Sequence, residues 1–248
     1  MTPNFSPKEI ESLSLQFETA SPQEIIAWAV KNFCPDLVLS SSFQTQSVPL
    51  IHMVKETKPD MRIFFLDTGK HFWDTLFFRE HLEQIWDLNI VDLRPDEKWR
   101  RVLRQFGHDL PETDPNLCCY IRKVQPMQKA MDGLGAWITG IRREQTENRA
   151  HAKILEYKRD GLLRIAPLLN WTLDEVLDYI SSNNLPRHPM PLSRYPSIGC
   201  KPCTRAIQIG ENERAGRWDG QGKTECGLHT EMFNKDGVTG DDFKLKIE

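Results

Sequence analysis

The sequence lacks any long apolar run, and no uninterrupted stretch approaches the roughly 18 residues expected of a membrane span. Its first residues, "MTPNFSPKEIESL", have neither the basic start nor the apolar segment of a signal peptide. Both absences argue against a membrane or secreted protein, so we expect a cytoplasmic protein with no membrane partner. No internal repeat is evident, and 248 residues with 39% hydrophobic content predict one globular domain with appendages.

An excess of positive charge is also missing, because the formal net charge is -3. This balance argues against nonspecific binding to duplex nucleic acid, and we expect no nucleic-acid partner. Local basic groups in "RPDEKWRRVLR" and "GIRREQTENR" can still meet an anionic ligand. A small phosphorylated molecule therefore fits this chain better than a nucleic acid.

Cysteine is scarce, with six in the chain, and in a reducing compartment these are expected to be metal ligands or reactive thiols rather than disulfides. "CC" at 118–119 and "CKPC" at 200–203 supply four thiols, which suit either a [4Fe–4S] cluster or a structural zinc ion. Adjacent cysteines are unusual in zinc sites, so the pattern favours a cluster. A redox dithiol at Cys200 and Cys203 is an alternative, but it would leave the "CC" pair unexplained.

Apolar, β-branched runs alternate with helical patterns along the first two thirds of the chain. This alternation predicts an α/β fold with a single parallel sheet and helices on both faces. The expected strands are "LVLSSSF" at 37–43, "RIFFLD" at 62–67, "LNIVDL" at 88–93, "AWITGI" at 136–141 and "LLRIAPL" at 162–168. A helix is expected over 71–86, and capping boxes predict helix starts at "SPKE" (6–9), "SPQE" (21–24) and "TLDE" (172–175).

The character of the sequence changes near its end, where it becomes glycine-rich and charged. We expect residues 1–34 to form N-terminal helices and residues 35–205 to form the α/β domain that carries both cysteine pairs. Residues 206–248 are expected to be a mobile tail without a core of its own.

Open parallel sheets bind ligands beyond the carboxyl ends of their strands. The first strand runs into "SSSFQTQS" at 40–47, where hydroxyls and backbone N–H groups at a helix start predict an anion site. Arg142, Arg143 and Arg149 follow the fourth strand at the same sheet edge, and guanidinium groups bind phosphate and sulfate well. The alternatives are a serine-rich turn with a helix cap and a solvated basic loop paired with Glu144 and Glu147.

Two cysteines remain outside the pairs. Cys34 follows a helix with a mostly apolar face and is interpreted as a packing residue. Cys226 lies in the polar tail, in "KTECGLH", and is a candidate nucleophile whose thiolate Lys223 or His229 would favour. An incidental exposed thiol is the alternative for Cys226.

Seven motifs occur in an order that resembles the sulfonucleotide reductases of assimilatory sulfate reduction, over roughly residues 35–232. They are "SSSFQTQS", "LDTG", "CCYIRKVQPM", "GIRREQTENR", "SIGCKPCTR", "ENERAGRW" and "KTECGLHTE". The two cysteine pairs resemble the iron–sulfur type, which uses adenosine 5′-phosphosulfate (APS), whereas the type without them usually requires the 3′-phosphorylated nucleotide (PAPS).

This resemblance implies an adenine nucleotide α-hydrolase-like fold, a [4Fe–4S] cofactor and a set of residue roles. Cys226 would be the nucleophile. The cluster ligands would be Cys118, Cys119, Cys200 and Cys203. The nucleotide would contact Ser40, Ser42, Phe43, Gln44, Thr45 and Leu66, and the phosphosulfate would contact Lys123, Arg149, Arg214 and Arg217. One departure is the serine turn, which lacks the Gly-Gly-x-Asp pattern of related ATP-cleaving enzymes and the glycine that cluster-bearing reductases often keep.

The implied activity is reduction of APS to sulfite and AMP through an S-sulfocysteine, with thioredoxin or glutaredoxin as the reductant. The tail would close over the nucleotide and then swing out to the reductant. The competing hypotheses are a PAPS or dual-substrate reductase, a nucleotide-binding iron–sulfur or zinc sensor, and a tRNA-thiolation enzyme, against which the missing Gly-Gly-x-Asp turn and the acidic charge both argue. The oligomeric state stays open, a homo-oligomer included.

Overall fold

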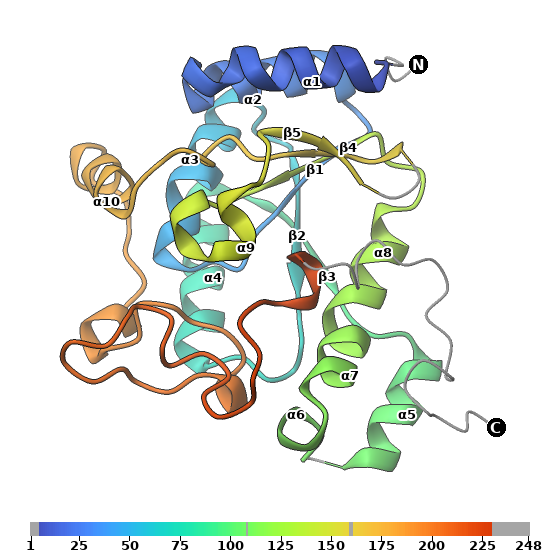
Figure 1. Ribbon diagram of the computed structural model, residues 1–248, viewed down its shortest axis with the longest axis vertical. Coiled ribbons are helices and arrows are strands. Elements are labelled where there is room, and N and C mark those ends of the chain that lie inside the picture. Colours follow the sequence, from blue (N-terminus) through green and yellow to red (C-terminus); the bar gives the residue numbers. More distant parts are fainter. Residues whose placement is uncertain (1–4, 108, 159–160, 230–248) are drawn as a thin grey trace. The chain divides into compact units, whose positions relative to one another are not determined.

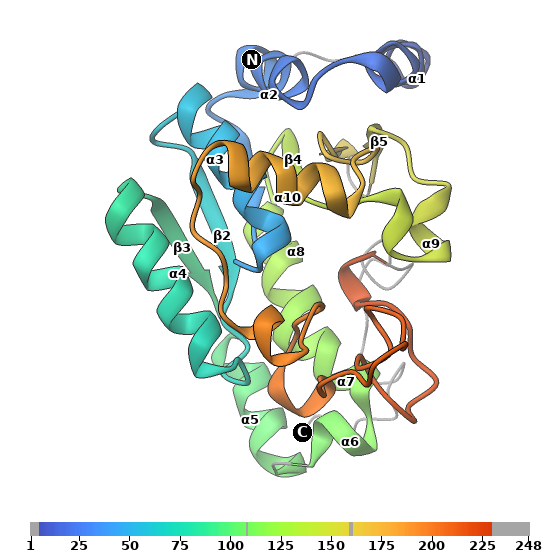
Figure 2. The same ribbon diagram turned by 90° about the vertical axis from the view of Figure 1, so that its left-hand side faces the viewer.

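The computed structural model describes residues 5–107, 109–158 and 161–229 (Figures 1 and 2). The chain forms two compact units whose segments alternate along the sequence. The sheet unit takes its described residues from Met1–Phe65, Phe72–Asp92 and Gly133–Pro191. The cysteine unit takes them from Leu66–His71, Leu93–Asp132 and Leu192–Glu248. This division differs from the expected boundaries at 34/35 and 205/206.

A six-stranded, mostly parallel sheet organises the sheet unit, and the predicted α/β architecture is confirmed. The strands are β1 (Leu37–Ser40), β2 (Arg62–Leu66), β3 (Asn89–Leu93), β4 (Ala136–Thr139), β5 (Leu155–Tyr157) and β6 (Leu163–Ile165). Their order is β3-β2-β1-β4-β6-β5. Because β1 lies between β2 and β4, the strand order reverses there, and such a switch point is where open sheets form ligand crevices.

The five predicted strands are correct in place; four of them are too long at their carboxyl ends, whereas the third ends at Leu93 as predicted. β1 ends at Ser40 and β4 ends at Thr139, because the residues that follow turn away into loops. The edge strand β5 was not predicted. It runs antiparallel to β6 and is only three residues long, which is too short to show an alternating pattern.

Helices of the sheet unit begin where local hydrogen bonding directs them. They are α1 (Pro7–Gln16), α2 (Pro22–Phe33), α3 (Val48–Thr57), α4 (Trp73–Trp86), α9 (Glu147–Ala150) and α10 (Leu173–Ser182). The three predicted capping boxes are confirmed at Ser6, Ser21 and Thr172, each accepting a backbone N–H from a glutamate three residues on. α3 packs between α2 and α10 (Figure 2).

One face of the sheet forms the main hydrophobic core. Alternate strand residues point to it, including Leu39, Ile63 and Ile138, and all are at most 2% exposed. Each such side chain stabilises the fold by about 1.5–3 kcal/mol on burial. Cys34 packs against this core as a partly buried residue, as predicted.

The cysteine unit is built from short helices and loops. Its helical elements are α5 (Glu97–Phe106), α6 (Leu110–Thr113), α7 (Pro115–Cys119), the π-helical turn η3 (Tyr120–Val124), α8 (Gln125–Met131), and the 3₁₀ turns η7 (Lys201–Cys203) and η8 (Gly227–His229). α7, η3 and α8 follow one another in one column (Figure 1). Among the described residues, no helix combines the length and hydrophobicity needed to cross a bilayer.

The described part of the predicted tail is held in place rather than free of contacts. The Arg205 N–H donates to Gly216 O at 2.9 Å, and the Trp218 N–H donates to Cys203 O at 3.1 Å. Arg205 also pairs with Glu211 and Asp219. Backbone hydrogen bonds and ion pairs therefore connect the polar residues 206–229 to the cysteine unit. The rest of the predicted tail, residues 230–248, lies outside the described residues.

Candidate active site

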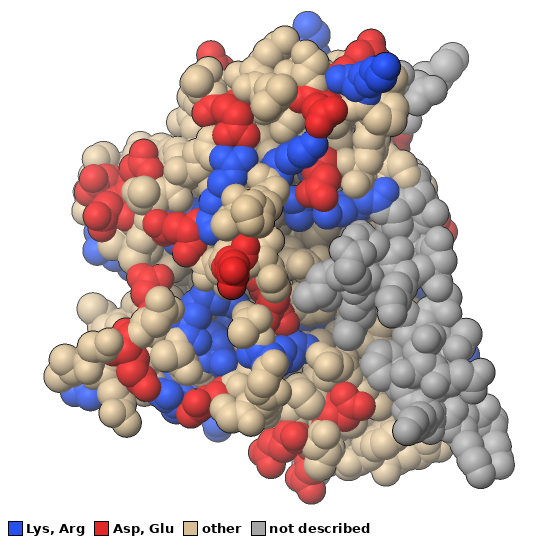
Figure 3. Space-filling view, viewed as in Figure 1, with Lys and Arg blue, Asp and Glu red and all other residues tan. Residues whose placement is uncertain are grey.

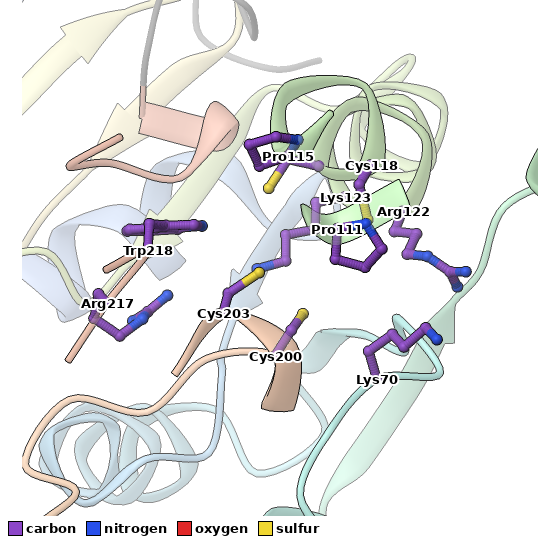
Figure 4. A pocket seen from close by; sticks show the side chains of 11 residues that line it. Lys70, Pro111, Pro115, Cys118, Arg122, Lys123, Cys200, Cys203, Arg217 and Trp218 are labelled. Atoms are coloured by element: carbon purple, nitrogen blue, oxygen red, sulfur yellow. The ribbon is translucent and has the colours of Figure 1, made fainter. Parts of the chain in front are cut away.

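Two cysteine pairs line one cavity of the cysteine unit (Figure 4). Asp114 caps α7 by accepting the Leu117 N–H at 2.9 Å, which places Cys118 and Cys119 at the carboxyl end of this short helix. Cys200 and Cys203 come from the opposite wall, where the Cys203 N–H donates to Cys200 O at 2.9 Å and closes the turn. All four side chains are at most 9% exposed.

The π-helical turn η3 directly after the cysteine pair positions Lys123. An extra residue per turn changes which side chains face inward, and such turns occur often at functional sites. Lys123 lines the cavity and reaches toward Cys203 in Figure 4. Burial alone would lower the pKa of Lys123, but Cys200, Cys226 and Cys119 outweigh it and hold this pKa above its ordinary value, so Lys123 stays a cation.

Four thiols line this cavity, and thiolates are the ligands of iron–sulfur clusters as well as of structural zinc ions. Within the described ranges, no three His, Cys, Asp or Glu side chains lie close enough together to hold one ion. The chemistry of the four side chains therefore fits a thiolate-bound metal group.

Burial favours the protonated form of two of these thiols, Cys203 and Cys118, when no metal is bound. It raises the pKa of Cys203 to about 11, and it also raises the pKa of Cys118. Ligation requires thiolates, so loading a metal group would release these protons.

Cys226 packs against Cys200, Cys203 and Trp218. The Cys119 thiol donates a hydrogen bond to the Cys226 sulfur, and this bond lowers the pKa of Cys226 well below its ordinary value. Burial opposes this shift, whereas the charges of Lys123 and Lys223 add to it. The same bond raises the pKa of Cys119, so the pair shares one proton and Cys119 holds it. If Cys119 were a metal ligand, Lys123 and Lys223 would remain to favour the Cys226 thiolate.

Glu225 anchors the segment that carries Cys226. Its carboxylate is 3% exposed, accepts the Cys226 N–H at 2.9 Å and lies 3.6 Å from Arg214 Nη2. Lys223 Nζ donates to Asn116 Oδ1 at 2.8 Å on the opposite side of this segment. These contacts dock Cys226 on the cysteine unit.

Two arginines of the "ENERAGRW" motif share one hydroxyl. Arg214 Nη1 and Arg217 Nη1 lie 3.5 Å and 3.3 Å from Ser197 Oγ, and Arg217 Nη1 also donates to Ile198 O at 3.1 Å. Trp218 packs beside Arg217 at one end of the cavity, while Lys70 and Arg122 line the other end (Figure 4). The cysteine unit thus gathers cations around its thiols.

In the sheet unit, the serine turn leaves β1 through a left-handed residue. The Ser41 N–H still pairs with Phe64 O at 3.1 Å, and then Phe43 adopts φ 53° while its ring packs edge-on against Phe65. A bulky residue in this region carries strain and is often found at functional sites. The turn redirects the chain into α3.

The remaining residues of the expected nucleotide site have partners within the sheet unit or lie at the end of β2. Trp137 Nε1 donates to Ser40 Oγ at 2.6 Å, Ser42 Oγ lies 3.4 Å from Ser47 Oγ, and the His188 N–H donates to Thr45 Oγ1 at 3.2 Å. Gln44 immediately precedes a 3₁₀ turn that has no side-chain cap. Leu66 is the last residue of β2, and its carbonyl oxygen lies 2.8 Å from the His71 ring nitrogen.

The serine turn and the arginine loop after β4 meet at Gln46, as their common sheet edge predicts. Gln46 Oε1 accepts hydrogen bonds from Arg142 Nη2 and Gln145 Nε2, both at 2.9 Å, and Gln145 in turn accepts from Arg149. Arg142 is fully buried and Arg149 is 9% exposed, so these two are not solvated loop residues. Arg142 nevertheless pairs with Glu144, as the alternative interpretation expected.

Three buried residues near the thiols were missed by sequence reasoning: Ser197, Trp218 and Glu225. Glu225 directly precedes the candidate nucleophile, and Trp218 follows an arginine of the same motif, so sequence adjacency was the available signal. Ser197 gave no such signal.

Comparison with known proteins decides the family. Residues 36–206 match the model of the phosphoadenosine phosphosulfate reductase domain. The chain belongs to this family.

Curated members of the family cover nearly the whole chain. The adenosine 5′-phosphosulfate reductase of Bacillus mycoides is 37% identical over 220 residues, which are 88% of this chain and 94% of the relative. That of Salinibacter ruber is 36% identical over 236 residues, 94% of each chain.

Solved structures agree with the predicted adenine nucleotide α-hydrolase-like fold. The phosphoadenylyl-sulfate reductase of Candida auris, solved as a phosphate complex, has a TM-score of 0.70 and 27% identity over 84% of this chain and all of that one. The FMN adenylyltransferase of Candida glabrata has a TM-score of 0.54 at 15% identity, covering 99% of this chain and 85% of that one, a likeness in fold alone.

The surface of this family member carries charges of both signs. On the face shown in Figure 3, acidic and basic side chains are interspersed, which accords with the net charge of -3. Lys123 and Arg217 instead line the cavity of the cysteine unit.

Proposed function

We propose that the protein is an oxidoreductase that reduces APS to sulfite and AMP in assimilatory sulfate reduction, with Cys226 as its nucleophile. The strongest support is the position of Cys226, which lies beside the cysteine cavity in the same unit as Lys123, Arg214 and Arg217. A thiolate next to cations that bind sulfate and phosphate oxygens is suited to attack an anionic phosphosulfate. The named APS reductases among its relatives support the choice of substrate.

The proposed reaction has two displacement steps. The Cys226 thiolate attacks the sulfur of APS, the bond from that sulfur to the phosphate oxygen breaks, and AMP leaves with the electron pair. A thiolate of a dithiol protein then attacks Cys226 Sγ, sulfite leaves with the electron pair of the S–S bond, and a mixed disulfide forms. The second thiol of the reductant resolves it, so the dithiol supplies both electrons and Cys226 returns as a thiolate.

Arg214, Arg217 and Lys123 would bind the phosphosulfate in the cysteine unit. Ser197 orients both Arg214 and Arg217 toward a common position, which favours one bound anion rather than two. Thioredoxin or glutaredoxin would be the dithiol protein. The six cysteines, all free, suit a reducing compartment such as the cytoplasm.

Cys118, Cys119, Cys200 and Cys203 would hold a [4Fe–4S] cluster. When bound, it would supply structural support and an electrostatic environment beside Lys123, because the dithiol already provides both electrons. Iron and sulfide analysis with an absorption spectrum of anaerobically purified protein tests this assignment. A colourless protein containing one zinc ion per chain would overturn it.

The nucleophile is tested with APS in the absence of reductant. Wild-type protein should accumulate an adduct about 80 Da heavier, the mass of an SO₃ group, on the peptide containing Cys226. Cys226→Ser should form none, and Cys34→Ser should behave as wild type because Cys34 packs against the core of the sheet unit. An adduct that persists in Cys226→Ser contradicts the assignment.

PAPS is the second candidate substrate, supported by the likeness to the Candida auris enzyme. The cysteine pairs and the named relatives favour APS. Competition between APS and PAPS on the purified protein distinguishes the two, since the better substrate has the larger kcat/KM.

A further inference from the structure

Trp218 is surrounded by cations in the cysteine unit. The Cζ atom of Arg217 lies 4.3 Å from the centroid of its ring, the Lys223 Nζ lies 5.8 Å away, and the Arg214 Cζ lies 6.0 Å away. An indole face attracts cations within about 6 Å, most strongly when water is excluded, and Trp218 is 3% exposed. One aromatic ring therefore gathers the charges of three basic side chains.

Arg217 is confined on its other side by a glycine. A Cβ atom at Gly199 would lie 2.3 Å from Arg217 Nη2 and 2.6 Å from its Cζ, so the guanidinium group rests directly on the backbone there. The group is thus enclosed between the Gly199 backbone and the Trp218 ring. This arrangement fixes the plane of the guanidinium.

Arg217 forms no ion pair with a carboxylate within the part of the chain that the structure describes, and Glu225 acts on it only as a nearby charge. Its Nη1 donates to Ser197 Oγ and Ile198 O, while its Nε is buried and has no hydrogen-bond partner. A buried guanidinium in contact with neutral oxygens and an aromatic face keeps its charge available for an anionic ligand.

The backbone of Trp218 is strained. Its φ is 50°, a left-handed value that costs a bulky residue energy, and its indole Nε1 is buried without a hydrogen-bond partner. The left-handed backbone and the unpaired Nε1 are both explained if the role of Trp218 is to orient its ring toward the cations.

We propose that Trp218 is a positioning residue for substrate binding, whose aromatic face, together with Gly199, preorganises Arg217 for the anionic group of the substrate. This inference rests on the proposed function, because it takes APS as the anion. Without the ring, Arg217 would have to be ordered on binding, and that ordering would weaken affinity.

Site-specific fluorination of Trp218 tests the proposal, because fluorine withdraws charge from the ring face and hardly changes its size. The cluster-loaded Cys226→Ser protein, carrying tryptophan with zero to four fluorines at position 218, is titrated with APS by calorimetry. We expect Kd to rise with each fluorine, to about tenfold across the series, with iron per chain unchanged. A constant Kd would show that the ring only fills space and would overturn the proposal.

The matched control is the same series at Trp73, which is 73% exposed and lies tilted against Phe77; fluorination there should leave the Kd for APS unchanged. Gly199→Ala is an independent variant: the added methyl group must displace Arg217, and we expect a comparable loss of affinity at unchanged iron content. Unaltered affinity in Gly199→Ala would also count against the enclosed guanidinium. If unfluorinated protein fails to bind APS, the proposed function fails instead.

Discussion

The ion pair between Glu225 and Arg214 should control how firmly the Cys226 segment is docked. Glu225→Gln removes the charge of a carboxylate whose side chain is 2% exposed, while the amide oxygen can still accept the Cys226 N–H. Two unit charges 3.6 Å apart attract by about 5 kcal/mol at an effective dielectric constant of about 20. Desolvation of both groups offsets part of this attraction.

Arg214 keeps other partners in the variant, because its Nη2 donates to Thr224 O at 3.2 Å and its Nη1 approaches Ser197. We therefore expect a cost of about 2 kcal/mol, less than the full attraction. If the substitution destabilises the docked state of residues 223–229 by this amount, the equilibrium constant for opening of the segment rises about 30-fold.

Hydrogen exchange of the peptide covering residues 223–229 measures this opening directly, without depending on the reactivity of the thiol. Exchange in Glu225→Gln should be about 30-fold faster than in wild type. Glu211→Gln is the matched control, because Glu211 pairs with Arg205 at the surface and its loss should leave this peptide unchanged. Equal exchange rates in wild type and Glu225→Gln would refute the reasoning.

Two further predictions concern the sheet unit. Burial lowers the pKa of His188 to about 4. Between about pH 6.5 and pH 4 the unfolded chain therefore binds a proton at this residue that the folded chain does not bind. The contribution of His188 to the free energy of unfolding should be complete above about pH 6.5 and should decrease as the pH falls toward 4. Urea unfolding at several pH values should show that the free energy of unfolding depends less on pH in His188→Gln than in wild type. The same slope of this free energy against pH in both proteins would contradict the prediction. Gln46→Leu should lower the unfolding free energy by about 1–3 kcal/mol, because fully buried Arg142 loses a hydrogen-bond partner, and an unchanged urea midpoint would argue against that role.

Elements set by local chemistry could be predicted from the sequence. The capping boxes at Ser6, Ser21 and Thr172 depend on residues three positions apart, and the main strands depend on apolar runs. The cysteine pairs were recognisable because few other roles require four thiols in that spacing.

Features that depend on distant parts of the chain could not be predicted in this way. Residues 206–229 carry little apolar surface, so hydrophobicity gives no signal of the backbone hydrogen bonds and ion pairs that hold them. The burial of Glu225 depends on Arg214, and the enclosure of Arg217 depends on Gly199, which precedes it by eighteen positions. A sequence gives no distance between such partners.

The alternation of the two units along the chain has a consequence for synthesis on the ribosome. The cysteine unit is completed only by its third segment, which begins at Leu192. About 80 residues separate Cys119 from Cys200, so at about 5–20 residues per second the second pair follows the first by about 4–16 s. During that interval the nascent chain carries two thiols without the opposite wall of their cavity, and a chain truncated before Ser197 would never complete it.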